Sequence, residues 1–255
     1  MKERGFTLIE LVVVITIISI LAAFILGAIQ DVRQGGYAVQ CTNNLRELAA
    51  ANLRYAGEHD GRFCPAQEPN NNVRWHGVRT GNNEPFDPTK GALAPYLGTE
   101  ARVKLCPVFR DIVKGANSFE NGSGGYGYNA VYVGGTPPNK WIGEMMVNFP
   151  NPSRTVMFAD CALSRDNGVQ EYPFAEPWQW VSPIGKLAGS LSPSVHFRHR
   201  GKANVAWCDG HVTSESPAKL GSANYYGGDD TKEKIGWFGP EEENGYWNPR
   251  YEPAP

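Results

Sequence analysis

The chain has 255 residues and a formal net charge of -2, from 24 basic and 26 acidic residues. This length suits one ordinary domain with an appendage rather than two large domains. Because the charges nearly cancel and the basic residues are scattered, the composition excludes a global electrostatic attraction to nucleic acid or to anionic lipid. The 29 glycines and 19 prolines, set among short apolar runs, favour a loop-rich region with short strands.

The first predicted element is an apolar helix. No charged residue occurs from Leu11 to Ile29. These ~19 residues, at a rise of ~1.5 Å each, span about 28 Å, close to the ~30 Å hydrocarbon core of a bilayer. Lys2 and Arg4 precede the run, and because positive residues stay on the cytoplasmic side, everything after Gln30 is expected outside. A secretory signal peptide is the alternative, but no small-residue cleavage site follows a short apolar core.

Glu10 stands near the start of this run, and a carboxylate in hydrocarbon normally marks a functional contact because its burial costs several kcal/mol. The stretch GFTLIE at residues 5–10, after a short basic leader, resembles the processing site of type IV pilins and type II secretion pseudopilins. The resemblance implies that a membrane peptidase cuts between Gly5 and Phe6 and methylates Phe6. We then expect Glu10 to neutralise the Phe6 ammonium of a neighbouring subunit, which sets the register of a filament. In a plain signal anchor, by contrast, Glu10 would only reach toward the membrane surface.

Beyond Gln30 the apolar run becomes a helical stripe. Its members recur at three- and four-residue intervals: Ala38, Cys41, Leu45, Leu48, Ala49, Asn52, Leu53 and Ala56. This spacing predicts that the same helix continues to about residue 60, where Gly57 and the Asp60-Gly61 pair are stop signals. Gly35-Gly36 is a weak point inside the helix, at which local unwinding is expected.

A second resemblance lies further along the chain. His199 is followed by nine residues and then by Asp209-Gly210, and this H-x9-D-G pattern is similar to one found in a large group of pilin-like proteins, for which it implies no agreed chemical role. Strand-favouring residues flank Asp209-Gly210 and predict a β-hairpin with a two-residue turn. In that register Trp207 faces Val212, and both share the core side with Val205.

The expected fold is α+β and pilin-like: a long N-terminal helix, transmembrane in its first half, packed on a loop-rich head with an antiparallel sheet. The expected segments are a leader at 1–5, a transmembrane and filament-core helix at 6–29, the amphipathic second half of the helix at 30–60, a globular β-rich head at 61–215, and an aromatic and acidic C-terminal segment at 216–255. For the late tryptophans, covering the edges of the core is favoured over stacking on glycans.

Two groups of residues raise the question of a metal ion. His196, His199, Asp209 and His211 have ligand types suited to zinc, but their spacing matches no standard motif and basic neighbours oppose a cation. We expect ion pairs instead, with Arg198 or His199 paired to Asp160 or Asp209. Asp229, Asp230 and Glu233 offer oxygen ligands for a structural Ca²⁺, without the spacing of an EF-hand. Apart from this calcium alternative no cofactor is expected.

Five cysteines lie on the outer side of the membrane in this topology, where disulfides persist. The odd count leaves at least one thiol unpaired or bridging two subunits. The expected pairs are Cys64 with Cys106 and Cys161 with Cys208, which leaves Cys41 on the helix, although the sequence alone leaves other connectivities open. No Ser-His-Asp or Cys-His-Asn arrangement stands out, so no enzyme activity is expected.

Together these features predict a structural subunit of a type IV pilus-like or type II secretion pseudopilus filament, a helical homopolymer built through the N-terminal helix. The resemblance implies prepilin peptidase, an inner-membrane assembly platform and a cytoplasmic ATPase as partners, since the chain has no nucleotide site of its own. The precursor is expected in the inner membrane with one span and its head outside the cytoplasm, and the filament in the periplasm or on the cell surface. The alternatives are a membrane-anchored binding module with a pilin-type signal and an exported metalloenzyme. Nucleic acid is not an expected partner, because no basic stripe is interleaved with aromatic residues.

Overall fold

The computed structural model describes residues 7–113, 120–135, 141–166, 168–182, 185–221, 224 and 226–252. The chain divides into two compact units, Met1–Val39 and Gln40–Pro255. We call the second unit the head unit.

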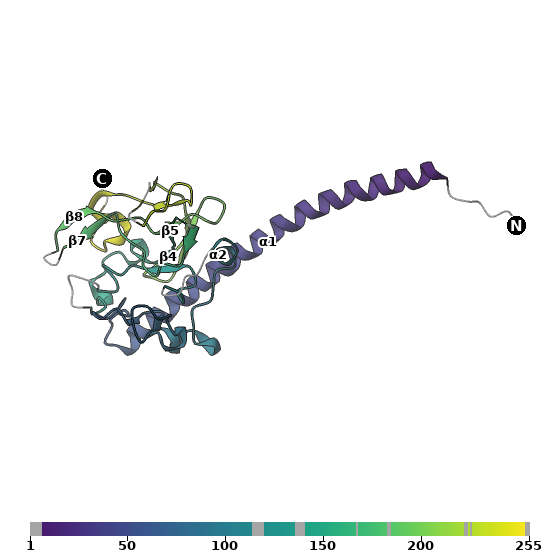
Figure 1. Cartoon of the computed structure of the whole chain (residues 1–255). Coiled ribbons are helices and arrows are strands. Elements are labelled where there is room, and N and C mark those ends of the chain that lie inside the picture. The colour runs from purple at the N-terminus through teal and green to yellow at the C-terminus, as the bar shows by residue number, and fades with distance from the viewer. Residues whose placement is uncertain are drawn as a thin grey trace. The chain divides into compact units, whose positions relative to one another are not determined.

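One helix, α1, runs from Leu8 to Glu58 (Figure 1). It begins with a capping box, in which the backbone N–H and the hydroxyl of Thr7 donate to Oε2 of Glu10 at 2.9 and 2.7 Å, while the N–H of Glu10 donates back to the Thr7 hydroxyl at 3.3 Å. Gly35 and Gly36 are helical, so the local unwinding predicted there does not occur. A cost of about 1 kcal/mol per glycine is small beside a cooperative hydrogen-bond ladder that continues on both sides.

The first unit presents an apolar surface. Leu8–Ile25 has a mean hydropathy of 2.9, and none of it is buried. Among the described residues, this is the one helical stretch long and apolar enough to cross a membrane. Contiguous apolar surface of this size marks a site that lipid or another protein covers.

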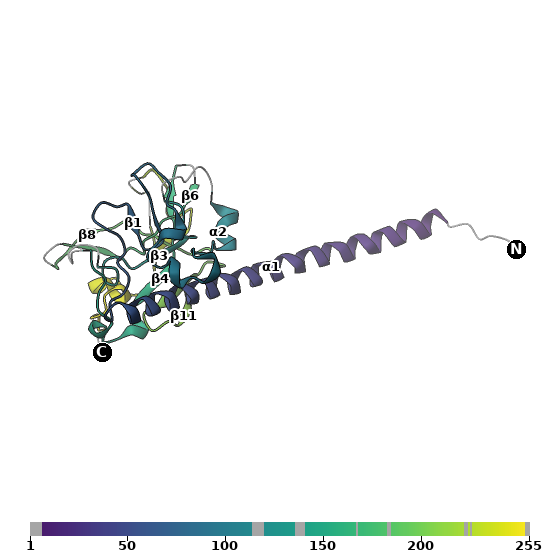
Figure 2. The same ribbon diagram turned by 90° about the horizontal axis from the view of Figure 1, so that it is seen from below.

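The part of α1 within the head unit is amphipathic, as the spacing predicts. Its buried face contains Cys41, Leu45, Leu48, Ala49, Asn52 and Ala56. Two amides on this face fix it to the strand β3 (Tyr126–Tyr128): Asn44 donates to the hydroxyl of Tyr126 at 3.1 Å, and Asn52 donates to the hydroxyl of Tyr128 at 3.0 Å. Figure 2 shows β3 and β4 beside this part of α1.

The head unit is built from short antiparallel strands. The central sheet has the order β11-β10-β4-β3, with β4 at Val156–Asp160, β10 at Ala203–Trp207 and β11 at Val212–Glu215. A second sheet has the order β12-β13-β9, with β9 at Val195–His196, β12 at Lys219–Leu220 and β13 at Ile235–Trp237. Three two-stranded sheets pair β1 (Val73–Arg74) with β2 (Gly77–Val78), β5 (Leu163–Arg165) with β6 (Gly168–Gln170), and β7 (Gln179–Val181) with β8 (Leu187–Ser190).

Helices other than α1 are short. The helix α2 spans Pro107–Ile112. The 3₁₀ helices are η1 (Pro88–Lys90), η2 (Ala94–Tyr96), η3 (Gly98–Glu100), η4 (Met146–Asn148), η5 (Pro152–Arg154) and η6 (Glu242–Trp247). The described residues therefore form the long helix and antiparallel sheet that the predicted α+β class requires.

Both faces of the central sheet are covered. Along β10, Ala206 packs in one apolar cluster with the buried face of α1, whereas Val205 packs in another with Trp237 and Trp247. Trp178 stacks on Trp237 with ring centroids 4.9 Å apart. Trp178, Trp237 and Trp247 are therefore core residues, in agreement with the favoured interpretation of the sequence, whereas Trp180 is 40% exposed.

The hairpin of β10 and β11 is present, but its loop is one residue longer than predicted. Ala206 pairs with Val212, and the N–H of Trp207 donates to the carbonyl of His211 at 3.0 Å, so residues 208–210 form a three-residue loop. Gly210 has a φ of +93°, the left-handed conformation that closes such loops. Because side chains alternate along a strand, this one-residue shift moves Val212 to the α1 face, away from Trp207.

Candidate functional site

Asp160, the last residue of β4, lies at the centre of a buried ionic cluster. Its Oδ1 accepts from Nη2 of Arg198 at 2.6 Å, and its Oδ2 lies 3.2 Å from Nε2 of His199. The side chains of Asp160 and Arg198 are only 0% and 1% exposed. The backbone N–H of Asn204 also donates to Oδ2 at 2.7 Å. The prediction that Arg198 or His199 pairs with an aspartate is confirmed, and Asp160 pairs with both.

The position of Arg198 explains how a buried carboxylate stays ionised. Burial alone raises the pKa of Asp160, but the Arg198 guanidinium and the bond to His199 hold that pKa below its ordinary value. Arg198 also donates to the carbonyls of Gly125 at 2.6 Å and Cys161 at 3.3 Å, and it lies 5.0 Å from the ring centroid of Phe109. The pair is therefore embedded in hydrogen bonds, the condition under which a buried ion pair is tolerated.

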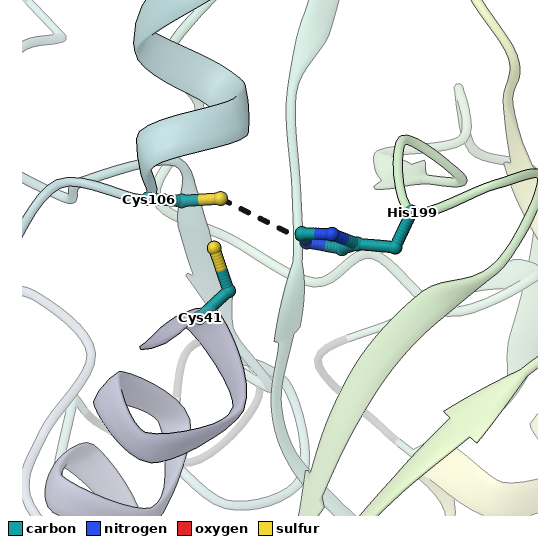
Figure 3. Close-up of side chains that lie close together, drawn as sticks. All are labelled: Cys41, Cys106 and His199. Atoms are coloured by element: carbon teal, nitrogen blue, oxygen red, sulfur yellow. Dashed lines mark hydrogen bonds between the residues drawn. The ribbon is translucent and has the colours of Figure 1, made fainter. Parts of the chain in front are cut away.

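Two thiols lie beside the same histidine (Figure 3). Cys106 Sγ is 3.8 Å from His199 Nε2, and one ligand atom from each of Cys41, Cys106 and His199 lies within 4.8 Å of the other two. All three residues are buried. Cys41 belongs to α1, Cys106 caps the N-terminus of α2, and His199 belongs to a tight turn before β10, which it closes with Lys202. Three segments far apart in the sequence thus converge on one point.

The charged neighbours set the protonation of this cluster. Burial raises the pKa of the Cys106 thiol, but the hydrogen bond from Cys41, the charge of Arg198 and the bond to His199 lower it to about 4. The hydrogen bond to Cys106, together with burial, raises the pKa of Cys41. Burial lowers the pKa of His199, yet its bonds to Asp160 and Cys106 raise it to about 9. Near neutral pH the cluster holds an imidazolium, a thiolate and a thiol, and the thiolate is the form that binds metals or attacks disulfides.

The H-x9-D-G residues do not meet in the structure. β10 separates His199 from Asp209, and its five residues extend over about 17 Å. Asp209 lies in the hairpin loop, where its Oδ1 is 2.6 Å from Nδ1 of His211. His196 is buried on β9, where its Nδ1 lies 3.4 Å from Arg198 Nη1. The four residues considered for zinc from the sequence are therefore dispersed, and only His199 belongs to the buried cluster.

At the N-terminus the structure describes one of the three residues predicted for processing or assembly. Gly5 and Phe6 lie outside the described residues. Glu10 is exposed in the first turn of α1, where its carboxylate accepts from Thr7, and the uncharged run from Leu11 follows directly after it.

Residues 1–26 match the family model of the prokaryotic N-terminal methylation motif. The chain carries a prepilin-type signal. The match includes the expected leader, Glu10 and most of the apolar stretch, and it supports a pilin- or pseudopilin-type precursor that is anchored in a membrane. No curated protein and no solved structure matches the chain.

The cysteines are not paired as predicted, since all five are free. The pair Cys161–Cys208 is wrong because the two residues follow β4 and β10, which are antiparallel, and so lie at opposite ends of that ladder. The pair Cys64–Cys106 is wrong because the two residues contact different parts of α1. The N–H of Cys64 donates to Asn52 at 2.8 Å, whereas Cys106 lies beside Cys41, about three helical turns earlier. Sequence reasoning missed the contact of Cys41 with Cys106. The helical stripe could show that Cys41 is buried, but not what covers it.

The acidic residues considered for calcium do not share one set of contacts. Asp230 is buried and accepts from the hydroxyl of Ser164 and the amide of Asn224. Asp229 accepts from the N–H of Lys232 at 3.1 Å, and Glu233 lies 4.0 Å from the Lys232 ammonium. Within the described part of the chain, the residues that gather with the spacing of metal ligands are Cys41, Cys106 and His199.

Proposed function

We propose that the chain is a structural subunit of a type IV pilus-like or type II secretion pseudopilus filament. In this proposal prepilin peptidase cuts between Gly5 and Phe6 and methylates Phe6, and the mature subunits polymerise through α1. The observation that carries the proposal is the methylation motif at residues 1–26, continued by an uninterrupted helix whose first 18 residues, Leu8–Ile25, have a mean hydropathy of 2.9 and are unburied.

The exposed apolar surface of Leu8–Ile25 must be shielded from water both before and after assembly. Lipid covers it in the precursor, and the helices of neighbouring subunits cover it in the filament. Because lipid tails and helix side chains are similarly apolar, the transfer from membrane to filament does not face the full hydrophobic cost of exposure to water. An external ATPase and an assembly platform at the inner membrane supply the remaining work in this scheme.

Glu10 specifies where a new subunit binds. Cleavage after Gly5 creates an ammonium on Phe6, and two buried charges are far less costly as a hydrogen-bonded pair than when each is alone. A subunit is therefore most stable where its Phe6 ammonium meets the Glu10 carboxylate of a neighbour. The capping contact with Thr7 is local to one chain and leaves the second carboxylate oxygen of Glu10 for this contact.

The test is the replacement Glu10→Gln in cells that assemble the filament, followed by shearing of surface filaments and immunoblotting of the sheared and membrane fractions. We expect the variant to remain in the membrane, with filament yield reduced at least about tenfold, equivalent to ~1.4 kcal/mol. Mass spectrometry of wild-type filaments should recover a peptide that begins with methylated Phe6.

Glu68→Gln is the matched control, because Glu68 is an exposed glutamate of the head unit far along the chain from α1's apolar part. It should assemble like the wild type. Wild-type yield from Glu10→Gln would contradict the proposed role of the carboxylate. Sheared filaments whose chains keep Met1 would contradict processing, and recovery of the wild type only from membranes would favour the anchored binding module instead.

A further inference from the structure

We propose that Cys41, Cys106 and His199 bind a zinc ion, which fastens α1 to the α2 loop and to the turn before β10. This site is independent of the filament function proposed above, and it lies entirely within the head unit.

The separation of the ligand atoms suits a tetrahedral ion. Zinc lies ~2.3 Å from a thiolate sulfur and ~2.0–2.1 Å from an imidazole nitrogen, so that two ligands of one ion are about 3.6 Å (sulfur to nitrogen) or about 3.8 Å (sulfur to sulfur) apart. Cys106 Sγ and His199 Nε2 are 3.8 Å apart, and all three ligand atoms lie within 4.8 Å of one another. Figure 3 shows the two sulfurs and the ring edge of His199 turned toward one another. The three separations therefore exceed those around one zinc ion by about 1 Å at most.

Charge complementarity also favours a divalent cation. In their metal-binding forms Cys41 and Cys106 are thiolates and His199 is neutral, so that with ionised Asp160 and protonated Arg198 the buried groups carry a formal charge of about -2. One Zn²⁺ neutralises this charge, and two protons leave to solvent as the bonds to zinc form, one from the Cys41 thiol and one from the His199 imidazolium. Arg198 does not oppose the ion as an isolated cation, because its guanidinium is paired with Asp160 at 2.6 Å.

Asp160 is a charged neighbour of the site, outside the three ligand atoms that lie within 4.8 Å of one another. Its Oδ2 lies 3.2 Å from His199 Nε2, so its negative charge is close to the position of a bound cation. Its other oxygen keeps the bond to Arg198.

The chemistry of the set selects zinc over the calcium considered from the sequence. Thiolates and imidazole are ligands of zinc and other thiophilic metals, whereas calcium takes oxygen ligands. The other cysteines lack this arrangement: Cys161 Sγ contacts the Ser194 hydroxyl at 3.8 Å, and Cys64 Sγ contacts the Pro65 carbonyl at 3.3 Å. The three ligands are far apart in the sequence, so an ion bound to them in the folded state links distant segments of the chain and stabilises the head unit.

The test uses the full chain, purified in detergent with a non-thiol reductant, incubated with Zn²⁺ and dialysed before elemental analysis by mass spectrometry. We expect about one zinc per chain in the wild type and in the control Cys64→Ser, and at least a tenfold lower zinc content in Cys41→Ser and in Cys106→Ser. Tryptophan fluorescence of each variant checks that the head unit is folded.

Cobalt provides a measurement that needs no variant. Co²⁺ added to the wild-type chain should produce the thiolate-to-cobalt absorption of a tetrahedral sulfur site, and zinc should abolish it. The proposal is overturned if the reduced wild type binds neither metal, or if Cys106→Ser binds as much zinc as Cys64→Ser. It is equally overturned if the chain isolated from cells without reductant contains no zinc and has Cys41 joined to Cys106 by a disulfide.

Discussion

The ion pair of Asp160 and Arg198 allows a quantitative test of how the head unit is held together. The replacement Asp160→Asn keeps the volume of the side chain and an acceptor for the N–H of Asn204, but it removes the charge. Arg198, whose side chain is 1% exposed, is then a buried cation without its counterion. The variant therefore isolates the electrostatic contribution at this point of the structure.

Removing one partner of a buried ion pair costs about 3–5 kcal/mol, and because asparagine preserves one hydrogen bond we expect the lower end, about 3 kcal/mol. In a domain of ~150–250 residues each kcal/mol lowers the melting temperature by roughly 2–4 °C, so the variant should melt about 6–12 °C below the wild type. The control Asp111→Asn removes a carboxylate that is 58% exposed and 3.5 Å from Arg110, and it should change stability by less than ~0.5 kcal/mol.

The assay is chemical and thermal unfolding of the full chain in detergent, followed by tryptophan fluorescence. All seven tryptophans lie beyond residue 40, so the signal reports the head unit alone. An Asp160→Asn variant within about 1 kcal/mol of the wild type would refute the reasoning, because the buried guanidinium would then need no counterion.

The same pair predicts a pH dependence. The pKa of Asp160 is held below its ordinary value in the folded state, so its contribution is fully present above the unfolded-state pKa of ~3.9 and is lost as pH falls through the folded-state pKa. The stability difference between the wild type and Asp160→Asn should therefore narrow as the pH is lowered below about 4. A difference that stays constant through this range would show that the charge of Asp160 is not what stabilises the fold.

Two further replacements test the packing of the head unit by the same unfolding assay. Gly127→Ala places a Cβ 2.6 Å from the backbone carbonyl carbon of Phe174 and should lower the free energy of unfolding by about 1–3 kcal/mol. In the control Gly81→Ala the new Cβ meets nothing within 4 Å, so its stability should be close to that of the wild type. Equal stability of the two variants would contradict the close approach at Gly127. Asn52→Ala leaves the buried N–H of Cys64 without its acceptor at 2.8 Å and should cost about 1–3 kcal/mol, and an unchanged midpoint would show that another group accepts this hydrogen bond.

The hairpin shows how far local patterns extend. Strand-favouring residues and Asp209-Gly210 predict the two strands and the turn, and β10 and β11 are found there. They do not predict the loop length, because a two-residue loop and a three-residue loop both use glycine at the left-handed position. The choice depends on packing, since only the three-residue register places Val212 against the α1 face of the sheet.

The N-terminal signal and α1 were determined by the sequence itself. Helix formation follows from contacts three and four residues apart, and a membrane span follows from the length of an uncharged run, so Glu10, Leu8–Ile25 and the buried stripe can be identified without a tertiary structure. Only the tertiary structure decided which distant groups meet. It brings Cys41 next to Cys106 and His199 next to Asp160. These contacts depend on how strands and loops pack over α1, which the spacing of residues along the chain does not determine.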